Sequence, residues 1–564
     1  MNPARVIAAA IVAIISLGAA RSVAGDDVAA GTHGAVATDQ RLATQSGLRV
    51  LREGGNAVDA AVAIGYTLAV TYPAAGNIGG GGFMLVRFAD GRAHFIDFRE
   101  TAPTAAGANM YLDSSGNVIP DRSIVGPLSA GVPGSVAGLE YARAKYGTRS
   151  RHELIRDAIG FADRGFTLTE ADADELASSQ DVLLKFPATA AIFAPSGATP
   201  AAGTLFRQPD LAQTLRAIDA SGDDGFYKGR IAHELAASIR ASGGIVSEAD
   251  LAAYRVLERD PLTCKHGGDT IVTSPPPSSG GVVICEILGI LGDARPSLPV
   301  RGFENAHLEV EAERRAFADR NARLGDPAFV PSPVAELLDP AYLARLRAGI
   351  SPERATPSSH IRAGIAEHEG TNTTNYSVID AAGNAVDATY TLNNSFGSGF
   401  VAGTTGVLMN DEMDDFTSKP GAPNMFGLVQ GAANAIAPGK RPLSSMSPSI
   451  VVDASGRAVL AAGAAGGPRI ITTTLDIIRA VVDFREEPGT ALADQRMHMQ
   501  WLPDILFAQP GTFDEATAGR LRRAGYTIEA GPAHSVANAV GTRSDGTRVG
   551  AHDPRAPTGS AAAY

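Results

Sequence analysis

The sequence has little that would bind nucleic acid, cross a membrane or hold a metal ion. Its 564 residues carry a net charge of −12 and no run rich in Lys and Arg, which argues against nucleic-acid binding, because that binding depends mainly on neutralising phosphates. Beyond the N-terminus no stretch approaches the roughly 18 apolar residues of a membrane span. No Cys/His cluster has ligand spacing, so neither a metal nor a cofactor is indicated.

Cysteine is scarce as well. Cys264 and Cys285 are the only two in the chain. A disulfide is possible in an oxidising compartment, but Cys285 lies in the apolar run 282–291, and buried free thiols are common in such surroundings. The sequence therefore favours two free thiols over a bridge.

The first 24 residues have the composition of a secretory signal peptide. Arg5 supplies the charged region, residues 6–19 the apolar region, and Ser22-Val23-Ala24 a small-x-small cleavage site. An uncleaved membrane anchor is the alternative, but the apolar run is short for a span. We expect export to the periplasm or the outside, with no membrane span left after the signal is removed.

A β-hairpin is predicted around Ala382, where a turn composition lies between two strand-like stretches. In that hairpin Val378 pairs with Val386, and Thr373 with Thr391. Directly opposed residues point to the same face of a sheet, with Cβ atoms roughly 5 Å apart. The register therefore places two threonine hydroxyl groups side by side at the open end of the hairpin.

Thr373 has the chemistry of a nucleophile only if a base takes its proton, and no His or Lys occupies the neighbouring positions. If the bond between Asn372 and Thr373 broke, Thr373 would gain an α-amine with a pKa of roughly 7.7–8.0. That amine would serve as the base on the same residue. The alternative is that two threonines simply begin a strand, which threonine favours.

Other predicted elements lie before the hairpin. Asp39 is expected to cap a helix that runs to about Arg52, and residues 57–72 predict a buried helix, because they are small and apolar almost all round. The glycines at 79–82 lack the partners of a phosphate-binding loop, so we expect them to allow close backbone packing. Residues 345–370 have the polar composition of a mobile segment.

Several long motifs follow one another along the chain: Gly54-Gly55-Asn56-Ala57-Val58-Asp59-Ala60-Ala61, Asp97-Phe98-Arg99-Glu100, Thr371-Asn372-Thr373-Thr374, Asn410-Asp411-Glu412-Met413-Asp414-Asp415-Phe416, Arg441-Pro442-Leu443-Ser444-Ser445-Met446 and Gly466-Gly467-Pro468-Arg469. In sequence and order they resemble the γ-glutamyltranspeptidase (glutathione hydrolase) family of N-terminal nucleophile hydrolases. The resemblance runs from near Asp39 to Tyr564.

The resemblance implies an α+β fold, a four-layer αββα sandwich formed jointly by two subunits that arise by autoproteolysis. Cleavage at Asn372-Thr373 would give a large subunit, 25–372, and a small subunit, 373–564, which together form one domain. It also implies an enzyme that forms a γ-glutamyl ester from glutathione or other γ-glutamyl compounds. The γ-glutamyl group then passes to water or to amino-acid and dipeptide acceptors.

The same resemblance assigns a role to each site residue. Thr373 is the nucleophile, Thr391 orients it, and the backbone N–H groups of Gly466 and Gly467 stabilise the oxyanion. Acceptors for the substrate's α-amino group are Asn393, Glu412 and Asp415. Donors to its α-carboxylate are Arg99, Ser444 and Ser445; a guanidinium grips a carboxylate with two parallel hydrogen bonds. Taken singly, these residues are equally typical of loops and turns.

Two positions depart from the family pattern. Asn375 stands where members often have His, and Phe426 stands where they have Tyr, in a lid segment expected over 420–440. Phe426 has no hydroxyl to donate, so we expect a different hydrogen-bond balance near the nucleophile.

Two alternative functions remain at this stage. An acylase of the same fold would cut glutaryl amides such as cephalosporin side chains, and it would leave the amino-group acceptors without a purpose. An uncleaved periplasmic amino-acid-binding protein would keep the chain in one piece.

Overall fold

The computed structural model describes residues 27–292, 299–361, 373–425, 428–531 and 535–564. The expected signal peptide, Asn372 and Phe426 lie outside these residues. Among the helices that are described, none has the length and apolar character needed to cross a membrane.

Two large antiparallel sheets form the centre of the molecule, each with seven strands in the described part of the chain. Sheet I has the order β19 (Ser560–Ala563), β2 (Ala35–Thr38), β10 (Thr374–Ile379), β11 (Ala385–Thr391), β3 (Gly81–Arg87), β4 (Ala93–Asp97) and β7 (Leu257–Arg259). Sheet II has the order β1 (Val28–Gly31), β18 (Arg548–His552), β17 (Ala537–Thr542), β13 (Ala458–Ala464), β12 (Ser449–Val452), β9 (Asp269–Thr273) and β8 (Leu262–His266).

The strands of sheet I are buried on both faces because each face packs against a different layer. Val378 and Val386 pack in one apolar core with the helices that cover this sheet. Their neighbours Ile379 and Ala385 pack in a second core together with sheet II. Successive strand residues point to opposite faces, so every residue of β10 and β11 is buried.

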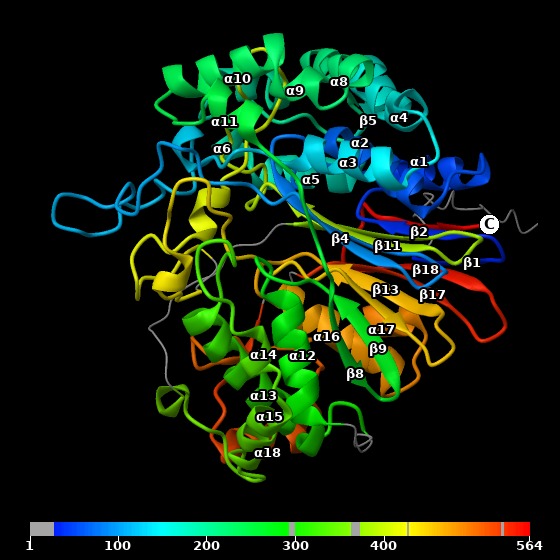
Figure 1. Ribbon diagram of the computed structural model, residues 1–564, viewed down its shortest axis with the longest axis vertical. Coiled ribbons are helices and arrows are strands. Elements are labelled where there is room, and N and C mark those ends of the chain that lie inside the picture. Colours follow the sequence, from blue (N-terminus) through cyan, green and yellow to red (C-terminus); the bar gives the residue numbers. More distant parts are fainter. Residues whose placement is uncertain (1–26, 293–298, 362–372, 426–427, 532–534) are drawn as a thin grey trace, which may run out of the picture.

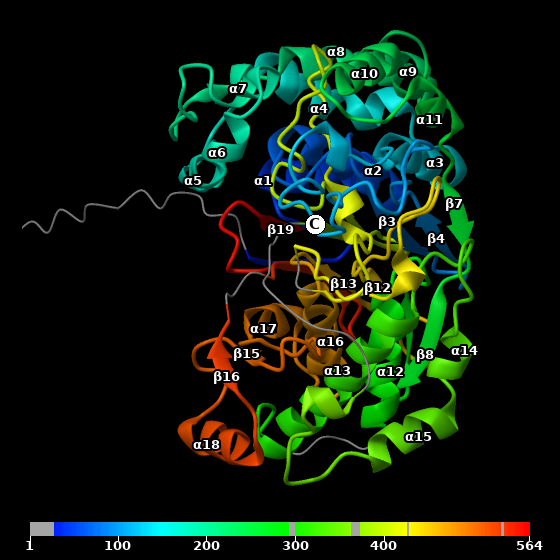
Figure 2. The same ribbon diagram turned by 90° about the vertical axis from the view of Figure 1, so that its left-hand side faces the viewer.

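Helices cover the outer face of each sheet, which gives the αββα layer order seen in Figures 1 and 2. Over sheet I lie α1 (Arg41–Arg52), α2 (Ala57–Thr71), α3 (Ser135–Tyr146) and α4 (Arg151–Arg164). Against sheet II lie α12 (Gly280–Leu291), α13 (Phe303–Arg323), α16 (Arg469–Val482) and α17 (Pro488–Ala493). The expected α+β sandwich is confirmed.

The remaining elements extend these layers. Above sheet I they are α5 (Glu170–Ser178), α6 (Gln180–Leu183), α7 (Pro187–Phe193), α8 (Pro209–Ser221), α9 (Asp224–Tyr227), α10 (Gly229–Ala241), α11 (Glu248–Ala253) and the pair β5 (Phe166–Thr167) and β6 (Leu205–Phe206). Below sheet II they are α14 (Val334–Leu337), α15 (Pro340–Ala348), α18 (Glu515–Ala524), β14 (Met497–His498), β15 (Leu506–Ala508) and β16 (Ile528–Ala530).

Both sheets take strands from each side of Thr373. In sheet I, β10, β11 and β19 come after this residue, and the other strands come before it; in sheet II, β1, β8 and β9 come before it. The segments 25–372 and 373–564 therefore share the same cores, and cleavage between them would leave the layers joined.

The first two helices follow the sequence patterns with one difference. Every residue of α2 is buried, as its apolar composition predicts, and Asn56 and Asp59 form a capping box at its start. α1 begins at Arg41 with Gln40 as its N-cap, so the prediction that Asp39 caps it is wrong. The Asp39 carboxylate instead accepts hydrogen bonds from the side chains of Thr374 and Asn538.

Cys264 and Cys285 form a disulfide with Cα atoms 5.9 Å apart, so the prediction of two free thiols is wrong. Cys264 lies on β8 and Cys285 on α12, which the fold brings together. The apolar run around Cys285 correctly indicates burial, but it carries no information about which strand the run contacts.

Two parts of the segment expected to be mobile have regular structure. α15 continues through Ala348, and a 3₁₀ turn at Ser358–His360 has Ser358 as its buried residue. The Ser358 hydroxyl donates to the carbonyl of Trp501 at 2.5 Å. The start of the segment thus continues a helix and Ser358 makes a tertiary contact, while the mobility of the segment stays a prediction. Residues 362–370 lie outside the described residues.

Candidate active site

The β10–β11 hairpin has the register that the sequence predicts. Val378 pairs with Val386, and the ladder continues to Thr374 and Tyr390. One step further, the Thr373 hydroxyl donates to the hydroxyl of Thr391 at 3.4 Å. Both threonines are buried, so the two hydroxyl groups meet in a largely water-free place.

Glycines let neighbouring backbone approach Thr391. A Cβ on Gly80 would lie 2.0 Å from the carbonyl oxygen of Thr391, and one on Gly79 would lie 2.1 Å from the carbonyl oxygen of Leu408. No side chain fits at such distances. The glycine run thus serves close packing, as predicted, and it does so beside the candidate nucleophile.

Asp39 anchors the strand that follows the nucleophile. Its carboxylate accepts hydrogen bonds from the Thr374 hydroxyl at 2.8 Å and from the Asn538 side chain at 2.7 Å. Asn538 also donates to the Asn375 carbonyl at 2.7 Å and contacts His552. Sequence analysis missed this network. The only available signal was an acidic residue directly before a helix, and that signal equally suits a helix cap.

A pocket opens at the two threonines and gathers nearly all of the predicted site residues. Its lining consists of Arg99, Thr373, Thr391, Asn393, Glu412, Asp415, Leu428, Ser444, Ser445, Met446, Gly467 and Ile470. Gly466 is the one described site residue outside this lining, and it adjoins Gly467. These residues come from widely separated parts of the chain and meet at the edge between the two sheets.

Arg99 is fully buried and surrounded by acids. Its guanidinium donates to the carboxylates of Glu412 and Asp415, and Glu100 lies 3.6 Å away. Burial alone would lower the pKa of Arg99, but these carboxylates outweigh it and raise that pKa above its usual range. Arg99 therefore remains a cation whose charge is already balanced inside the pocket.

The acids around Arg99 are crowded in a buried space. Burial raises the pKa of Glu412 well above its ordinary value, and it raises the pKa of Glu100 to about 7. Glu412 Oε2 is buried and has no hydrogen-bond partner among the described residues. Such an acceptor is suited to a cationic ligand group, because an ammonium has three donors and no acceptor.

Asn393 has a left-handed backbone conformation, with φ at +82°, which is uncommon for a non-glycine residue. Its backbone N–H donates to the Thr391 hydroxyl at 2.8 Å. Its side-chain nitrogen donates to the Asp411 carbonyl and contacts the Met425 sulfur at 3.6 Å. Met425 belongs to the expected lid, so this segment reaches the pocket.

The Gly466–Gly467 pair precedes the first turn of α16. Both glycines have positive φ, +122° and +57°, a region that other residues rarely adopt. Their backbone N–H groups donate to no acceptor in the described part of the chain. Two unused donors at the start of a helix form a suitable environment for a negative oxygen.

Asn375 lies on β10, within the hairpin, and outside the pocket lining. Its side-chain nitrogen donates to Asp387 at 2.9 Å and to the carbonyl of Ala388 and the hydroxyl of Thr389 at 3.0 Å. Burial raises the pKa of Asp387 to about 8. The departure from the family pattern at Asn375 therefore falls in a buried polar cluster that supports the strands.

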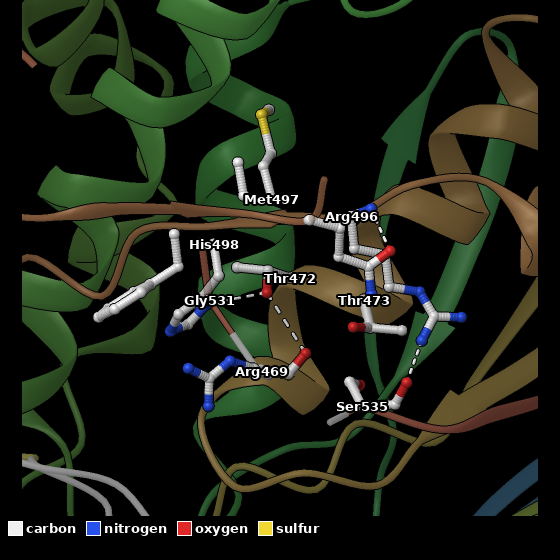
Figure 3. Close-up of a pocket in the computed structure, with 11 residues that line it drawn as sticks. Arg469, Thr472, Thr473, Arg496, Met497, His498, Gly531 and Ser535 are labelled. Carbon is white, nitrogen blue, oxygen red and sulfur yellow. Dashed lines mark hydrogen bonds between the residues drawn. The ribbon is translucent and has the colours of Figure 1, made fainter. Parts of the chain in front are cut away.

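A second cavity adjoins the first turn of α16 and is shown in Figure 3. Thr472 bonds to the carbonyl of Arg469 and to His498, while Arg496 donates to the Ser535 carbonyl. Burial and the Arg469 charge lower the pKa of His498 to about 3, so this histidine is neutral. The described residues include no cluster of His, Cys, Asp or Glu that is arranged to hold a metal ion.

Two sheets between helical layers, with a threonine hydroxyl at the start of an inner strand, define the protein as an N-terminal nucleophile hydrolase. Within that class, the chain belongs to the γ-glutamyltranspeptidase family: the model described as Gamma-glutamyltranspeptidase matches residues 43–563.

Individual proteins agree with this assignment. The chain is 50% identical to the glutathione hydrolase proenzyme of Pseudomonas sp. (strain A14), with 94% of each chain covered. It is 44% identical to that of Escherichia coli (strain K12), covering 94% of this chain and 92% of the relative.

Solved structures show the same fold. A cephalosporin acylase from Bacillus halodurans has a TM-score of 0.83 at 26% identity, covering 95% of this chain and 97% of that one. A Helicobacter pylori gamma-glutamyltranspeptidase chain has a TM-score of 0.56 at 42% identity, covering 59% of this chain and 96% of that one.

Proposed function

We propose that this protein is a γ-glutamyltranspeptidase and glutathione hydrolase that matures by cutting itself between Asn372 and Thr373. One observation carries the proposal: Thr373, a buried arginine and a set of acceptor groups share one pocket. The relatives at 44–50% identity are named glutathione hydrolase proenzymes, which supports both the activity and the cleavage.

Maturation begins when the Thr373 hydroxyl attacks the carbonyl carbon of Asn372. The peptide C–N bond breaks, the nitrogen takes a proton and becomes the Thr373 α-amine, and the acyl group now forms an ester with Oγ1. Water hydrolyses this ester and releases the Asn372 carboxylate. The large subunit 25–372 and the small subunit 373–564 result. The Thr391 hydroxyl, 3.4 Å away, holds the attacking oxygen in place.

Catalysis then uses the same oxygen. The Thr373 hydroxyl attacks the γ-carbonyl of glutathione or another γ-glutamyl compound, and its own α-amine takes the proton. The N–H groups of Gly466 and Gly467 receive the oxyanion, and loss of one such donor typically costs about 10²–10³ in rate. The amine leaves, and the ester passes its γ-glutamyl group to water, an amino acid or a dipeptide.

The α-ammonium and α-carboxylate groups of the substrate bind to two different sets of pocket residues. Asn393, Glu412 and Asp415 accept from the α-ammonium group, and the unpartnered Glu412 Oε2 supports that role. Arg99 together with the Ser444 and Ser445 hydroxyl groups donates to the α-carboxylate. A glutaryl amide lacks the amino group, and it would leave the buried Glu412 Oε2 without a donor.

We also propose that the protein works in the periplasm or outside the cell, after removal of residues 1–24. The Cys264–Cys285 disulfide supports this location, since such bridges persist in oxidising compartments.

The proposal is tested on purified protein. Denaturing electrophoresis should give two bands, and the smaller should begin at Thr373 by N-terminal sequencing, whereas Thr373→Ala should give one. γ-Glutamyl 4-nitroanilide should be hydrolysed at least tenfold faster than glutaryl 4-nitroanilide. The reverse preference would support an acylase, and a single wild-type band without turnover would support a binding protein.

A further inference from the structure

Arg320, on α13, is a second buried arginine beside the pocket. Its side chain is almost fully enclosed, with 1% relative exposure. It donates to three neutral oxygens: Ser279 Oγ at 2.9 Å, Asn321 Oδ1 at 2.8 Å and Ser445 Oγ at 3.1 Å. Ser445 lines the pocket together with Thr373.

Arg320 and Arg99 differ in how their positive charges are balanced. Among the described residues no carboxylate lies within ion-pair distance of Arg320, whereas Arg99 is held by two. Burial lowers the pKa of Arg320 to about 10, although the nearby charge of Asp415 opposes this shift, so Arg320 is still a cation at neutral pH. A buried cation without a paired anion is costly, and a bound anion nearby would offset that cost.

The direction of the hydrogen bond from Arg320 determines how the Ser445 hydroxyl is oriented. A guanidinium donates and never accepts, so Ser445 Oγ must accept from Arg320. In the described part of the chain this is the only side-chain partner of that hydroxyl, which leaves its hydrogen available for the pocket. Ser279, which also accepts from Arg320, already donates its hydrogen to the Ser444 carbonyl at 2.6 Å.

We propose that Arg320 is a positioning and specificity-determining residue for the substrate carboxylate. It turns the Ser445 hydroxyl into a donor toward the pocket, and it adds a second positive charge to that of Arg99, which Glu412 and Asp415 partly balance. This inference rests on the proposed function. Arg320 lies in 25–372 and Ser445 in 373–564, so the contact also spans the cleavage point.

The test compares two donors, γ-glutamyl 4-nitroanilide and its α-carboxamide analogue, which differ only in the carboxylate. Arg320→Gln should raise KM for the carboxylate donor at least tenfold and change kcat less than about threefold. The carboxamide donor should be affected less than threefold. Arg320→Lys, which keeps the charge, should give an intermediate loss. An equal loss for both donors would overturn the proposal.

Arg314→Gln is the matched control, because Arg314 is equally buried on the same helix but pairs with Asp504 outside the pocket. It should leave the ratio of the two donors unchanged. If Arg320→Gln does not mature, Arg320→Lys and Ser445→Ala are combined in a double-mutant cycle. Losses that are less than additive support action through Ser445, and fully additive losses overturn it.

The failure of this inference is separable from that of the proposed function. Wild-type protein that hydrolyses the γ-glutamyl anilide, with Arg320→Gln leaving the donor ratio unchanged, refutes only the role of Arg320. Wild-type protein that cleaves neither donor refutes the proposed function itself.

Discussion

The nucleophile end of the β10–β11 hairpin and the pocket beside it are built in opposite ways. Thr373 and Thr391 are 18 residues apart and meet because a short hairpin brings them together. Arg99 and Glu412 are 313 residues apart and meet only because sheet I, the 411–416 turn and the surrounding loops assemble. The attacking group is thus a local feature, and the recognition of substrate is a product of the whole fold.

This difference predicts how each region fails. A substitution of either threonine at the open end of the hairpin should slow self-cleavage and turnover together, since the Thr373 hydroxyl serves both reactions. A substitution in the pocket should spare self-cleavage and reduce turnover, because the precursor's own Asn372–Thr373 bond does not need the substrate subsite. Four experiments probe this contrast, in order of decreasing effect on turnover.

The largest effect is expected for Arg99→Gln. Glu412 and Asp415 would remain buried without their cation, and breaking a buried ion pair costs about 3–5 kcal/mol. We expect kcat/KM for γ-glutamyl 4-nitroanilide to fall at least 100-fold, with two bands still present on denaturing gels. Arg479→Gln, which breaks a buried pair with Glu309, is the control. Retention of a tenth of the activity by Arg99→Gln would contradict the pocket role.

Thr391→Val should act on both reactions. Valine keeps the shape but removes the hydroxyl that accepts from Thr373 and from the Asn393 N–H. A buried donor left unpaired costs about 1–3 kcal/mol, so we expect maturation and turnover each to slow about tenfold or more. Thr389→Val, on the same strand, is the matched control. Maturation of Thr391→Val at the wild-type rate would show that the pairing has no chemical role.

Asp387→Asn should change the pH dependence of stability more than activity. Burial raises the pKa of Asp387 to about 8, so the folded protein holds a proton that the unfolded chain loses near pH 4. This contribution to stability is complete below about pH 4 and is lost as the pH rises through about 8. The unfolding temperature of wild type relative to the variant should fall by a few degrees from about pH 5 to 9.

The control for that experiment is Asp453→Asn. Hydrogen bonds from Ser455 and Arg457 outweigh partial burial and lower the pKa of Asp453 to about 2, so its titration lies below the range measured. The difference between wild type and this variant should stay constant with pH. A constant difference for Asp387→Asn as well would mean that Asp387 is ionised in the folded protein.

The smallest effect on turnover is expected for the double variant Cys264→Ser, Cys285→Ser. The disulfide closes a loop of 21 residues, for which chain entropy gives about 3 kcal/mol of stabilisation. We expect a lower unfolding temperature with kcat/KM within about twofold of wild type. A reductant should lower the wild-type unfolding temperature and leave that of the double variant unchanged; equal responses would indicate free thiols.

The sequence by itself determines the features whose contacts are local. The turn composition around Ala382 predicts the register of Val378 and Val386, because the loop of a hairpin fixes which residues lie opposite each other. The composition of α2 predicts its burial, and the family motifs identify the residues of the pocket. Signal-peptide cleavage and the roles of individual site residues remain predictions.

Only the tertiary structure decides which distant groups meet. The partners of Arg99, the anchoring of Thr374 by Asp39, the hydroxyl that Arg320 orients and the bridge between Cys264 and Cys285 all join separate elements. The position of a charged residue or a thiol in the sequence follows no periodic pattern from which its partner could be predicted. Its role depends on burial and on the groups within a few ångströms, and both are set when the layers pack.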